Sequence, residues 1–427
     1  MASSRGSRSS AFATGRALRS PDSLDAVVLT HAHLDHVGYL PRLVAQGYRG
    51  RIFCTGGTAD LCRLVLPDAA RIQEEDARQA NKHGYSKHHP ALPLYTEGDA
   101  ARALTQLQPV GYERPIEAAT GITIRFSPAG HLLGSAYVLM TLAGGATILF
   151  GGDLGRYGRP VLPDPADATD ADLVLVVSTY GDRDHAPDDR GEALAAVIHE
   201  TRERGGRLIV PAFAVGRVGE LLYWIRRLER DRRIPVLPVY VDSPMAIDAL
   251  RFYGARLAEL DADMLPAAKG VSAFASTRFQ TVASPQQSKE LTASRHPAIV
   301  ISSSGMATGG RVLHHLAAAL PDRRHTVLFV GYQAAGTRGR QLVDGATEVR
   351  IHGRQVPVAA QVRKLDSMSA HADRGEILRW LGTLPRRPGR LCLVHGEPGP
   401  MDALRRLVAD RMQWDAQTPA HGERVAI

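Results

Sequence analysis

Residues 30–36 constrain this chain more than any other part of its sequence. They read THAHLDH, follow the apolar run 26–29, and place four potential metal ligands within six residues, namely His31, His33, Asp35 and His36. The apolar run predicts a buried strand, and a loop that leaves such a strand can aim imidazoles and a carboxylate into one pocket. Zn²⁺ takes nitrogen and oxygen ligands of this kind. We predict that His31 and His33 hold one zinc ion and that Asp35 and His36 hold a second one close by.

Short apolar segments recur along the chain and alternate with helical stretches. We predict strands at 122–126, 137–142, 147–150, 173–177, 208–210, 235–241, 298–301, 326–330 and 390–394, and helices at 67–81 and 191–205. From about residue 182 onward, the repeated order of strand, loop and helix predicts a parallel sheet with crossover helices. A chain of 427 residues is too long for one core, so we expect two or three α/β domains.

Three further candidate ligands lie at the ends of predicted strands. His131 follows Gly130 in a turn between two strands, Asp153 follows a strand and two glycines, and His395 follows the strand at 390–394. Sites in layered α/β folds gather at strand ends. We therefore predict that these three residues complete the site opened by residues 30–36.

The amino-acid composition indicates the kind of partner and the cellular compartment of the protein. There are 52 Lys and Arg residues against 44 Asp and Glu residues, and this excess of +8 suits an anionic partner. Three cysteines are too few for a disulfide framework and indicate a reducing compartment, so we predict a cytoplasmic protein. No run of 18 apolar residues occurs, so we expect no membrane span. Residues 1–20 are basic and lack acids, which predicts a disordered tail.

The motifs, taken in order, resemble those of the metallo-β-lactamase superfamily and, within it, the β-CASP nucleases of RNA processing. The likeness runs from about residue 25 to the C-terminus and is closest to the prokaryotic relatives of the endonuclease subunit of the pre-mRNA 3′-end cleavage complex. It rests on HAHLDH at 31–36, GHLLGSA around His131, GGDLGR around Asp153, STYGDR at 178–183, SAHAD around His371 and VHGE around His395. Further matches are PAFAVGR at 211–217, DSPMA at 242–246, SGM at 304–306 and GYQ at 331–333.

This resemblance implies an αββα sandwich at 21–185 and 366–427, interrupted by a β-CASP domain at 186–365. It implies that His31, His33 and His131 bind one zinc ion. By the same analogy Asp35, His36 and His395 bind the other, and Asp153 bridges the two. The expected activity is that of a zinc-dependent endonuclease or 5′–3′ exonuclease, with single-stranded RNA in the cleft between the domains. A homodimer is expected by analogy.

Catalytic and RNA-binding roles follow from the same reading. Asp35 and Asp153 belong to the catalytic metal site, and His371 is the candidate proton donor to the leaving 3′ oxygen. Ser304 and Gly305 are candidates for holding a flanking phosphate, because glycine lets the backbone approach closely. Arg217 and Arg340 are candidate phosphate contacts.

Two departures from the family pattern qualify this prediction. The family places an acid immediately before STYG, and here that position is Val177. We expect His371 to lose a carboxylate partner and with it proton affinity, which impairs catalysis. Only 30 residues precede His31, so the opening strands of the family are expected to be missing or atypical and one sheet edge to be exposed.

Two other functions compete with the ribonuclease. The first is a small-molecule hydrolase of the thioesterase or lactamase type, which the opening motif alone allows. The inserted domain argues against it, because a small substrate needs no long basic cleft. The second is a non-catalytic RNA-binding subunit, which Val177 favours, although the presence of all seven candidate ligands argues against complete loss of activity.

Overall fold

The computed structural model describes residues 20–84, 86–186, 190–264 and 273–427. Contacts divide these residues into two compact units. The split unit holds residues 20–184 and His371–Ile427, and the inserted unit holds His185–Ala370. The predicted tail lies outside the described residues, apart from Ser20.

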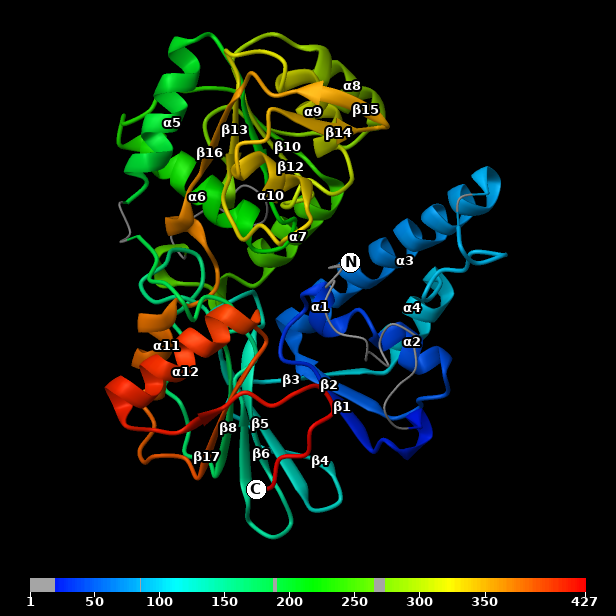
Figure 1. The fold of residues 1–427 in the computed structure, drawn as a ribbon, viewed down its shortest axis with the longest axis vertical. Helices are drawn as coiled ribbons and strands as arrows, with labels where there is room; N and C mark the ends of the chain where they lie inside the picture. The colour runs from blue at the N-terminus through cyan, green and yellow to red at the C-terminus, as the bar shows by residue number, and fades with distance from the viewer. Residues whose placement is uncertain (1–19, 85, 187–189, 265–272) are drawn as a thin grey trace. The chain divides into compact units, whose positions relative to one another are not determined.

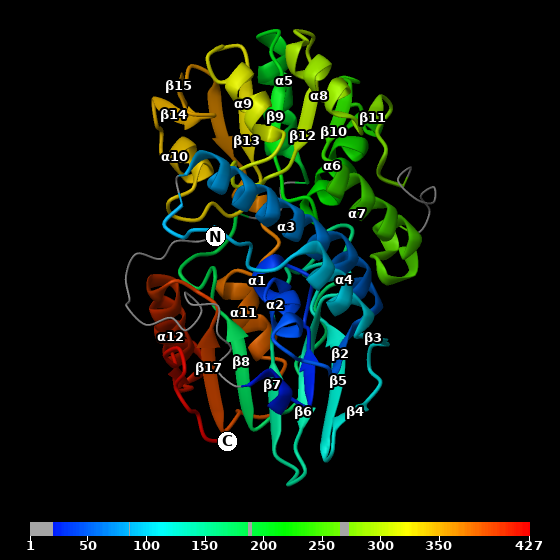
Figure 2. The ribbon, with the colours of Figure 1, turned by 90° about the vertical axis from the view of Figure 1, so that its right-hand side faces the viewer.

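The split unit consists of two sheets with helices on their outer faces (Figures 1 and 2). The smaller sheet is parallel, in the order β1-β2-β3, and β1 is its edge strand. The larger sheet has the order β18-β17-β8-β7-β6-β5-β4, parallel from β18 to β7 and antiparallel across β6, β5 and β4. This arrangement confirms the predicted sandwich. The strands are β1 (Ala26–Val28), β2 (Arg51–Thr55), β3 (Leu107–Val110), β4 (Ile116–Ala119), β5 (Ile122–Pro128), β6 (Ala136–Thr141), β7 (Thr147–Phe150), β8 (Leu173–Val177), β17 (Arg390–Val394) and β18 (Ala416–Gln417).

Two apolar cores hold these layers together. One lies between the sheets, where Phe53 of β2 meets Ile124 and Phe126 of β5. The other lies between the larger sheet and the C-terminal helices, around Val176 and Trp380. The helices are α1 (Leu34–Val37), α2 (Leu40–Ala45), α3 (Gly56–His83), α4 (Glu97–Thr105), α11 (Arg374–Leu381) and α12 (Pro398–Met412).

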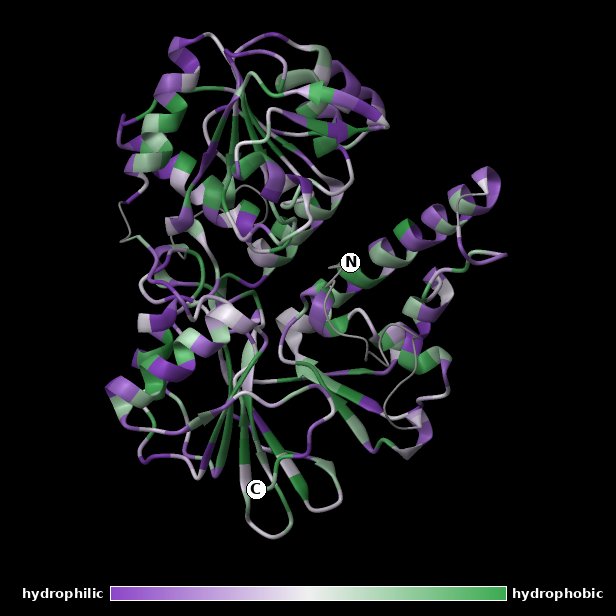
Figure 3. Ribbon diagram, in the orientation of Figure 1, coloured by the Kyte–Doolittle hydropathy of each residue, from purple (hydrophilic) through white to green (hydrophobic). Residues whose placement is uncertain are grey.

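The inserted unit is built on a six-stranded sheet in the order β11-β10-β12-β9-β13-β16. All of its neighbouring strands run parallel, as predicted. Its inner strands are mostly hydrophobic (Figure 3), as expected of a sheet covered on both faces. The strands are β9 (Leu208–Pro211), β10 (Val239–Asp242), β11 (Phe279–Thr281), β12 (Ile299–Ser302), β13 (Thr326–Phe329) and β16 (Gln361–Lys364), with a separate antiparallel hairpin of β14 (Glu348–Ile351) and β15 (Arg354–Pro357). The helices are α5 (Glu192–Glu203), α6 (Arg217–Arg230), α7 (Pro244–Ala255), α8 (Pro285–Ala293), α9 (Val312–Ala319) and α10 (Arg338–Val343).

Most predicted elements occur, but several boundaries differ, and the strand predicted at 235–241 is β10, which begins only at Val239. The strands predicted at 147–150, 173–177 and 390–394 are β7, β8 and β17. The helix predicted to begin at Pro67 is α3, which begins at Gly56 and contains Pro67 in its interior. The earlier start has a local cause, because the Thr55 side chain caps the helix by accepting a hydrogen bond from the Thr58 amide. Among the helices of the described residues, none has the length and apolar character needed to cross a bilayer.

Trp380 joins α11 to the larger sheet and supplies a test of this packing. Its side chain is fully buried, its indole N–H donates to the Ala166 carbonyl at 3.0 Å, and its ring meets the ring of Tyr137 at 5.4 Å. We expect Trp380→Ala to lower the free energy of unfolding by about 3–5 kcal/mol, because it leaves a cavity and an unpaired carbonyl. Urea denaturation followed by circular dichroism measures the change.

Leu92→Ala is the matched control, because this apolar side chain is 78% exposed. We expect a change within about 0.5 kcal/mol for this variant. Equal losses for the two variants would contradict the packing role of Trp380.

Candidate metal centre

The segment after β1 reaches the site because it is anchored on both sides. The Leu29 amide donates to the Phe53 carbonyl of β2 at 2.9 Å, and the Thr30 carbonyl accepts from the Ala136 amide of β6 at 2.8 Å. Beyond Thr30 the chain passes His31 and His33 and then forms the single helical turn α1. The predicted loop is therefore partly helical, and its last two candidate ligands lie on that turn.

The seven predicted ligands form two groups in the structure. Within each group the candidate ligand atoms lie within 4.8 Å of one another. The first group is mostly buried and the second is more exposed. The first consists of His31, His33, His131 and Asp153, and the second of Asp35, His36 and His395.

Asp153 lies between the two groups. Its Oδ2 is 3.4 Å from Nε2 of His31 and 3.4 Å from Nε2 of His36. Its Oδ1 is 3.6 Å from Nε2 of His395, which in turn is 3.6 Å from Oδ2 of Asp35. One carboxylate thus faces ligands of both groups, which is the geometry of a bridging residue.

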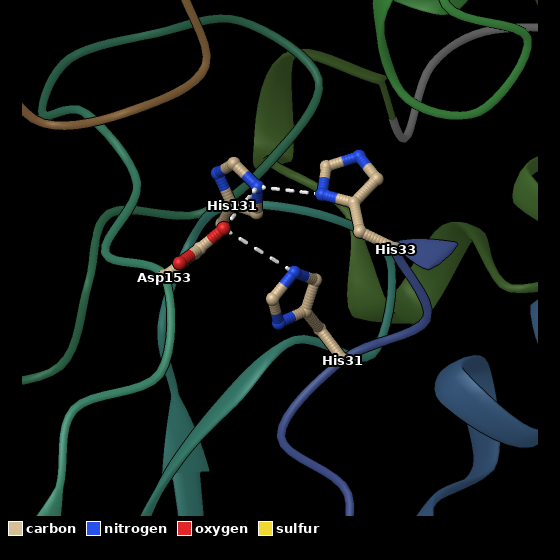
Figure 4. A group of neighbouring side chains, drawn as sticks. All are labelled: His31, His33, His131 and Asp153. Atoms are coloured by element: carbon tan, nitrogen blue, oxygen red, sulfur yellow. Dashed lines mark hydrogen bonds and ion pairs between the residues drawn. The ribbon is translucent and has the colours of Figure 1, made fainter. Parts of the chain in front are cut away.

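Figure 4 shows the buried group, with His31, His33 and His131 directed toward one another and toward Asp153. Nε2 of His131 lies 3.0 Å from Nδ1 of His33 and 3.6 Å from Oδ2 of Asp153. The turn that carries His131 depends on Gly130, which has a φ of 67° and packs against the Pro163 carbonyl. A side chain at position 130 would strain the turn and displace the imidazole.

Burial sets the protonation of the first group. It lowers the pKa of His31 and holds the pKa values of His33 and His131 well below the usual range. These imidazoles are therefore uncharged near neutral pH, which is the form that binds metal ions. Burial alone would raise the pKa of Asp153, but pairing with His31 and His36 outweighs it and holds that pKa well below the usual range.

The residues present fit a metal ion. Nε2 of His31, Nε2 of His36 and Oδ1 of Asp153 are buried and have no hydrogen-bond partner among the described residues. Buried polar atoms without partners cost free energy, and metal ions bound to the two groups would satisfy all three. A set of five imidazoles and two carboxylates suits Zn²⁺.

His371 lies beside this cluster. Its backbone forms an isolated antiparallel bridge with Gly155, and its Nδ1 is 3.8 Å from Oδ2 of Asp153. Its ring is 4.5 Å from the ring of His131. Burial lowers the pKa of His371, and the neighbouring Asp153 carboxylate only partly opposes this effect.

The position of the missing family acid is apolar in the structure. Val177 is buried in the core cluster that also contains Ala372. The two carboxylates that follow in sequence are engaged by arginines, Asp182 by Arg183 at 2.6 Å and Asp184 by Arg374 at 2.6 Å.

The candidate RNA contacts all lie in the inserted unit. Ser304 and Gly305 follow β12, and a Cβ at position 305 would lie 2.8 Å from the Phe213 amide. Glycine is therefore required there for close packing of two loops. Gln333 supports the same loop by donating to the Gly305 carbonyl at 3.0 Å.

The two candidate arginines are already engaged by carboxylates. Arg217 is buried at the start of α6 and pairs with Glu220. Arg340 is exposed and pairs with Asp344 at 2.6 Å. Contact of either arginine with a phosphate remains a prediction.

Sequence reasoning missed the residues that support the His131 turn. Ser135 Oγ accepts a hydrogen bond from the His131 amide at 2.9 Å. The hydroxyls of Thr55 and Thr58 donate to the Gly134 carbonyl at 2.5 and 2.9 Å. A threonine before a helix, such as Thr55, is recognised from sequence only as a capping residue. The hydrogen bonds from Thr55 and Thr58 to a turn 76 to 79 residues away become evident only in the folded chain.

Comparisons with known proteins agree with this geometry. Residues 218–342 match the β-CASP domain, 355–419 match the Zn-dependent metallo-hydrolase RNA specificity domain, and 4–203 match the β-lactamase superfamily domain. A ribonuclease of Thermus thermophilus is 38% identical over 396 residues, which cover 92% of this chain and 86% of the relative. The RNase J-like protein of Methanocaldococcus jannaschii is 31% identical, over 88% of this chain and 82% of its own length. The transcription termination factor FttA of Methanosarcina mazei is 32% identical over 88% of this chain, which spans 59% of that longer protein.

His31→Ala tests the first group. Loss of a residue that only hydrogen-bonds to a metal ligand typically lowers metal affinity roughly 10- to 100-fold. We expect a larger loss of affinity in this variant, because it removes a predicted direct ligand. Plasma mass spectrometry of dialysed protein measures the metal content. His88→Ala is the control, since His88 is exposed in a loop of the same unit. A His31→Ala protein with a full complement of metal would remove His31 from the site.

The lowered pKa values predict how stability of the metal-free protein depends on pH. In the unfolded chain a histidine titrates near about 6.5, whereas His31, His33 and His131 titrate lower in the folded protein. The unfolded chain therefore binds more protons as the pH falls through this range, so stability is full above about pH 7 and declines below it. His36 acts in the opposite sense, because pairing with Asp153 overcomes its burial and raises its pKa.

Urea midpoints of the chelated protein between about pH 8 and about pH 5 measure this decline. We expect a shallower decline in His131→Gln, because glutamine does not titrate. The same slope in both proteins would show that His131 carries no shifted pKa.

Proposed function

This chain belongs to the β-CASP family of the metallo-β-lactamase superfamily, and on that premise we propose that it is a zinc-dependent ribonuclease that hydrolyses phosphodiester bonds of single-stranded RNA. The observation that carries this proposal is the convergence of six other candidate ligands around Asp153 from segments far apart in the sequence. The RNA specificity domain match and the ribonuclease relative support RNA as the substrate. The excess of +8 in charge suits the same polyanion.

We propose two zinc ions. His31, His33 and His131 would hold the first. Asp35, His36 and His395 would hold the second, with Asp153 between them, and the two distinct ligand groups support this assignment. When bound, the ions supply the Lewis acidity that balances charge developing on phosphoryl oxygens.

The chain itself contributes orientation and a proton. Asp153 keeps its charge among the surrounding imidazoles and so fixes their directions. We propose that His371 donates its proton to the 3′ oxygen as the phosphorus–oxygen bond breaks and water adds to phosphorus, leaving a 5′-phosphate. The lowered pKa of His371 makes the protonated form scarce near neutral pH, which supports impaired catalysis in the absence of the family acid.

The remaining assignments are proposals of the same kind. Ser304 and Gly305 are proposed to hold a flanking phosphate, and Arg217 and Arg340 to contact phosphates after exchange of their carboxylate partners.

A cytoplasmic location is proposed because the three cysteines are buried and free. A homodimer is proposed on the resemblance alone, and light scattering tests it.

One experiment tests the function directly. Metal-replete protein is incubated with single-stranded RNA labelled at its 5′ or 3′ end, and the products are resolved by size. We expect cleavage with 5′-phosphate products, and the two labels distinguish internal cuts from stepwise digestion. Intact RNA with turnover of thioester or lactam substrates would identify a small-molecule hydrolase. RNA that is bound but left intact would identify a non-catalytic subunit.

Val177→Glu tests the missing acid. The variant places a carboxylate in the buried cluster that also contains Ala372, the residue after His371 in the chain. A neighbouring carboxylate favours the protonated imidazole, so we expect faster cleavage and a pH optimum displaced upward with unchanged zinc content. The stability of the variant should fall, because a charge is buried. An unchanged cleavage rate would show that the missing acid is irrelevant in this chain.

A further inference from the structure

We propose that the ion pair between Arg156 and Glu376 is a positioning device for His371. The inference rests on the proposed ribonuclease function and extends it to two residues outside the metal site. Arg156 lies three residues after Asp153, and Glu376 lies five residues after His371. The pair therefore connects the two segments that carry the bridging carboxylate and the proton donor.

Glu376 gathers three donors with one carboxylate. The residue stands in the first turn of α11, and its oxygens accept from Nε of Arg156 at 3.2 and 3.3 Å. They also accept from the amide of Tyr157 at 3.2 Å and from the amide of Asp373 at 3.0 Å. One side chain thus joins the segment after β7 to the start of α11.

His371 lies in the backbone segment that the Glu376 carboxylate holds in place. Its neighbour Ala372 donates its amide to the Leu154 carbonyl at 2.9 Å, and His371 itself bridges to Gly155. Gly155 is tightly enclosed, because a Cβ at that position would lie 2.0 Å from the Gly130 carbonyl. The backbone of His371 is therefore held against the segment that carries Asp153, two residues before the Glu376 contacts begin.

The environment makes this ion pair effective. The side chain of Arg156 is 7% exposed and that of Glu376 is 16% exposed. At such burial a charged hydrogen bond is stronger than at the surface, and losing one partner is costly. Glu376 also belongs to the capping box of α11, in which the Asp373 side chain accepts from the Glu376 amide at 2.8 Å and the Glu376 side chain accepts from the Asp373 amide at 3.0 Å.

The position of this backbone matters for the ring of His371. Arg156 and Glu376 hold the backbone that carries the ring, whose Nδ1 lies 3.8 Å from Oδ2 of Asp153 and whose centroid lies 4.5 Å from that of His131. A shift of about 1 Å in a reacting group is enough to cost roughly 100-fold in rate.

Glu376→Gln tests the proposal, because the amide keeps the shape of the side chain and a carbonyl acceptor but removes the charge that faces Arg156. We expect kcat on labelled RNA to fall roughly 10- to 100-fold. KM should stay within about twofold, because the change affects positioning rather than substrate binding. Zinc content should match that of the wild type, since no candidate ligand is altered. Arg156→Met carries the same expectations if Glu376→Gln fails to fold.

A readout independent of cleavage separates this proposal from the proposed function. In protein labelled with ¹³C at histidine Cε1, the His371 resonance is identified by its loss in His371→Gln. We expect that resonance to move or broaden in Glu376→Gln. If the wild type leaves RNA intact, the ribonuclease proposal fails, while the resonance still reports whether Glu376 positions His371.

The matched control is Glu113→Gln. Glu113 pairs with Arg125 at 2.9 Å and also joins two separate segments of the split unit, without contacting the site. It should leave kcat and the His371 resonance unchanged. A wild-type kcat or an unmoved His371 resonance in Glu376→Gln would overturn the proposal. A loss of zinc in parallel with activity would also overturn it, because the pair would then serve the metal centre instead.

Discussion

The buried carboxylate of Asp153 is the interaction on which the split unit depends. It lies within 3.4 to 3.8 Å of ring nitrogens from His31, His36, His131, His371 and His395. A charge in that position would be expensive without partners, and the imidazoles would be poorly held without the charge. These side chains come from five segments of the chain, and their contacts are favourable only when all five segments are in place. The segments are the loop after β1, the turn between β5 and β6, the segment after β7, the segment before α11 and the end of β17.

The inserted unit contains a buried carboxylate that is held in a comparable way. Asp242, at the end of β10, is fully buried and accepts from Nε2 of His315 at 2.7 Å, Nη1 of Arg311 at 2.8 Å and Oγ of Ser288 at 2.5 Å. Burial would raise the pKa of Asp242, but these donors outweigh it and lower that pKa. The group ties α8 and the start of α9 to the sheet. The candidate phosphate loop at Ser304 is thereby attached to a rigid support, since the Ser302 hydroxyl donates to the Asp242 carbonyl at 2.8 Å.

The local sequence pattern predicted secondary structure well wherever a single side chain or a single strand sets the limits of an element. The apolar runs of β7, β8 and β17 are short and bounded by polar residues, so their limits could be predicted to the residue. The start of α3 could not, because Pro67 resembles a helix start and the true cap is Thr55. The grouping of the candidate ligands at strand ends followed from the rule for layered α/β folds.

The sequence by itself determined the family, the alternation of strands and helices, and the residue types able to hold a metal, because these depend on short-range order and on side-chain chemistry. Only the tertiary structure decided which atoms face Asp153, that Val177 packs among apolar residues, and that Glu376 pairs with Arg156, which lies 220 residues earlier in the sequence. The physical reason is that burial, pKa and hydrogen-bond distance depend on which segments pack together. Residues distant in sequence share a dielectric environment only once the chain has folded.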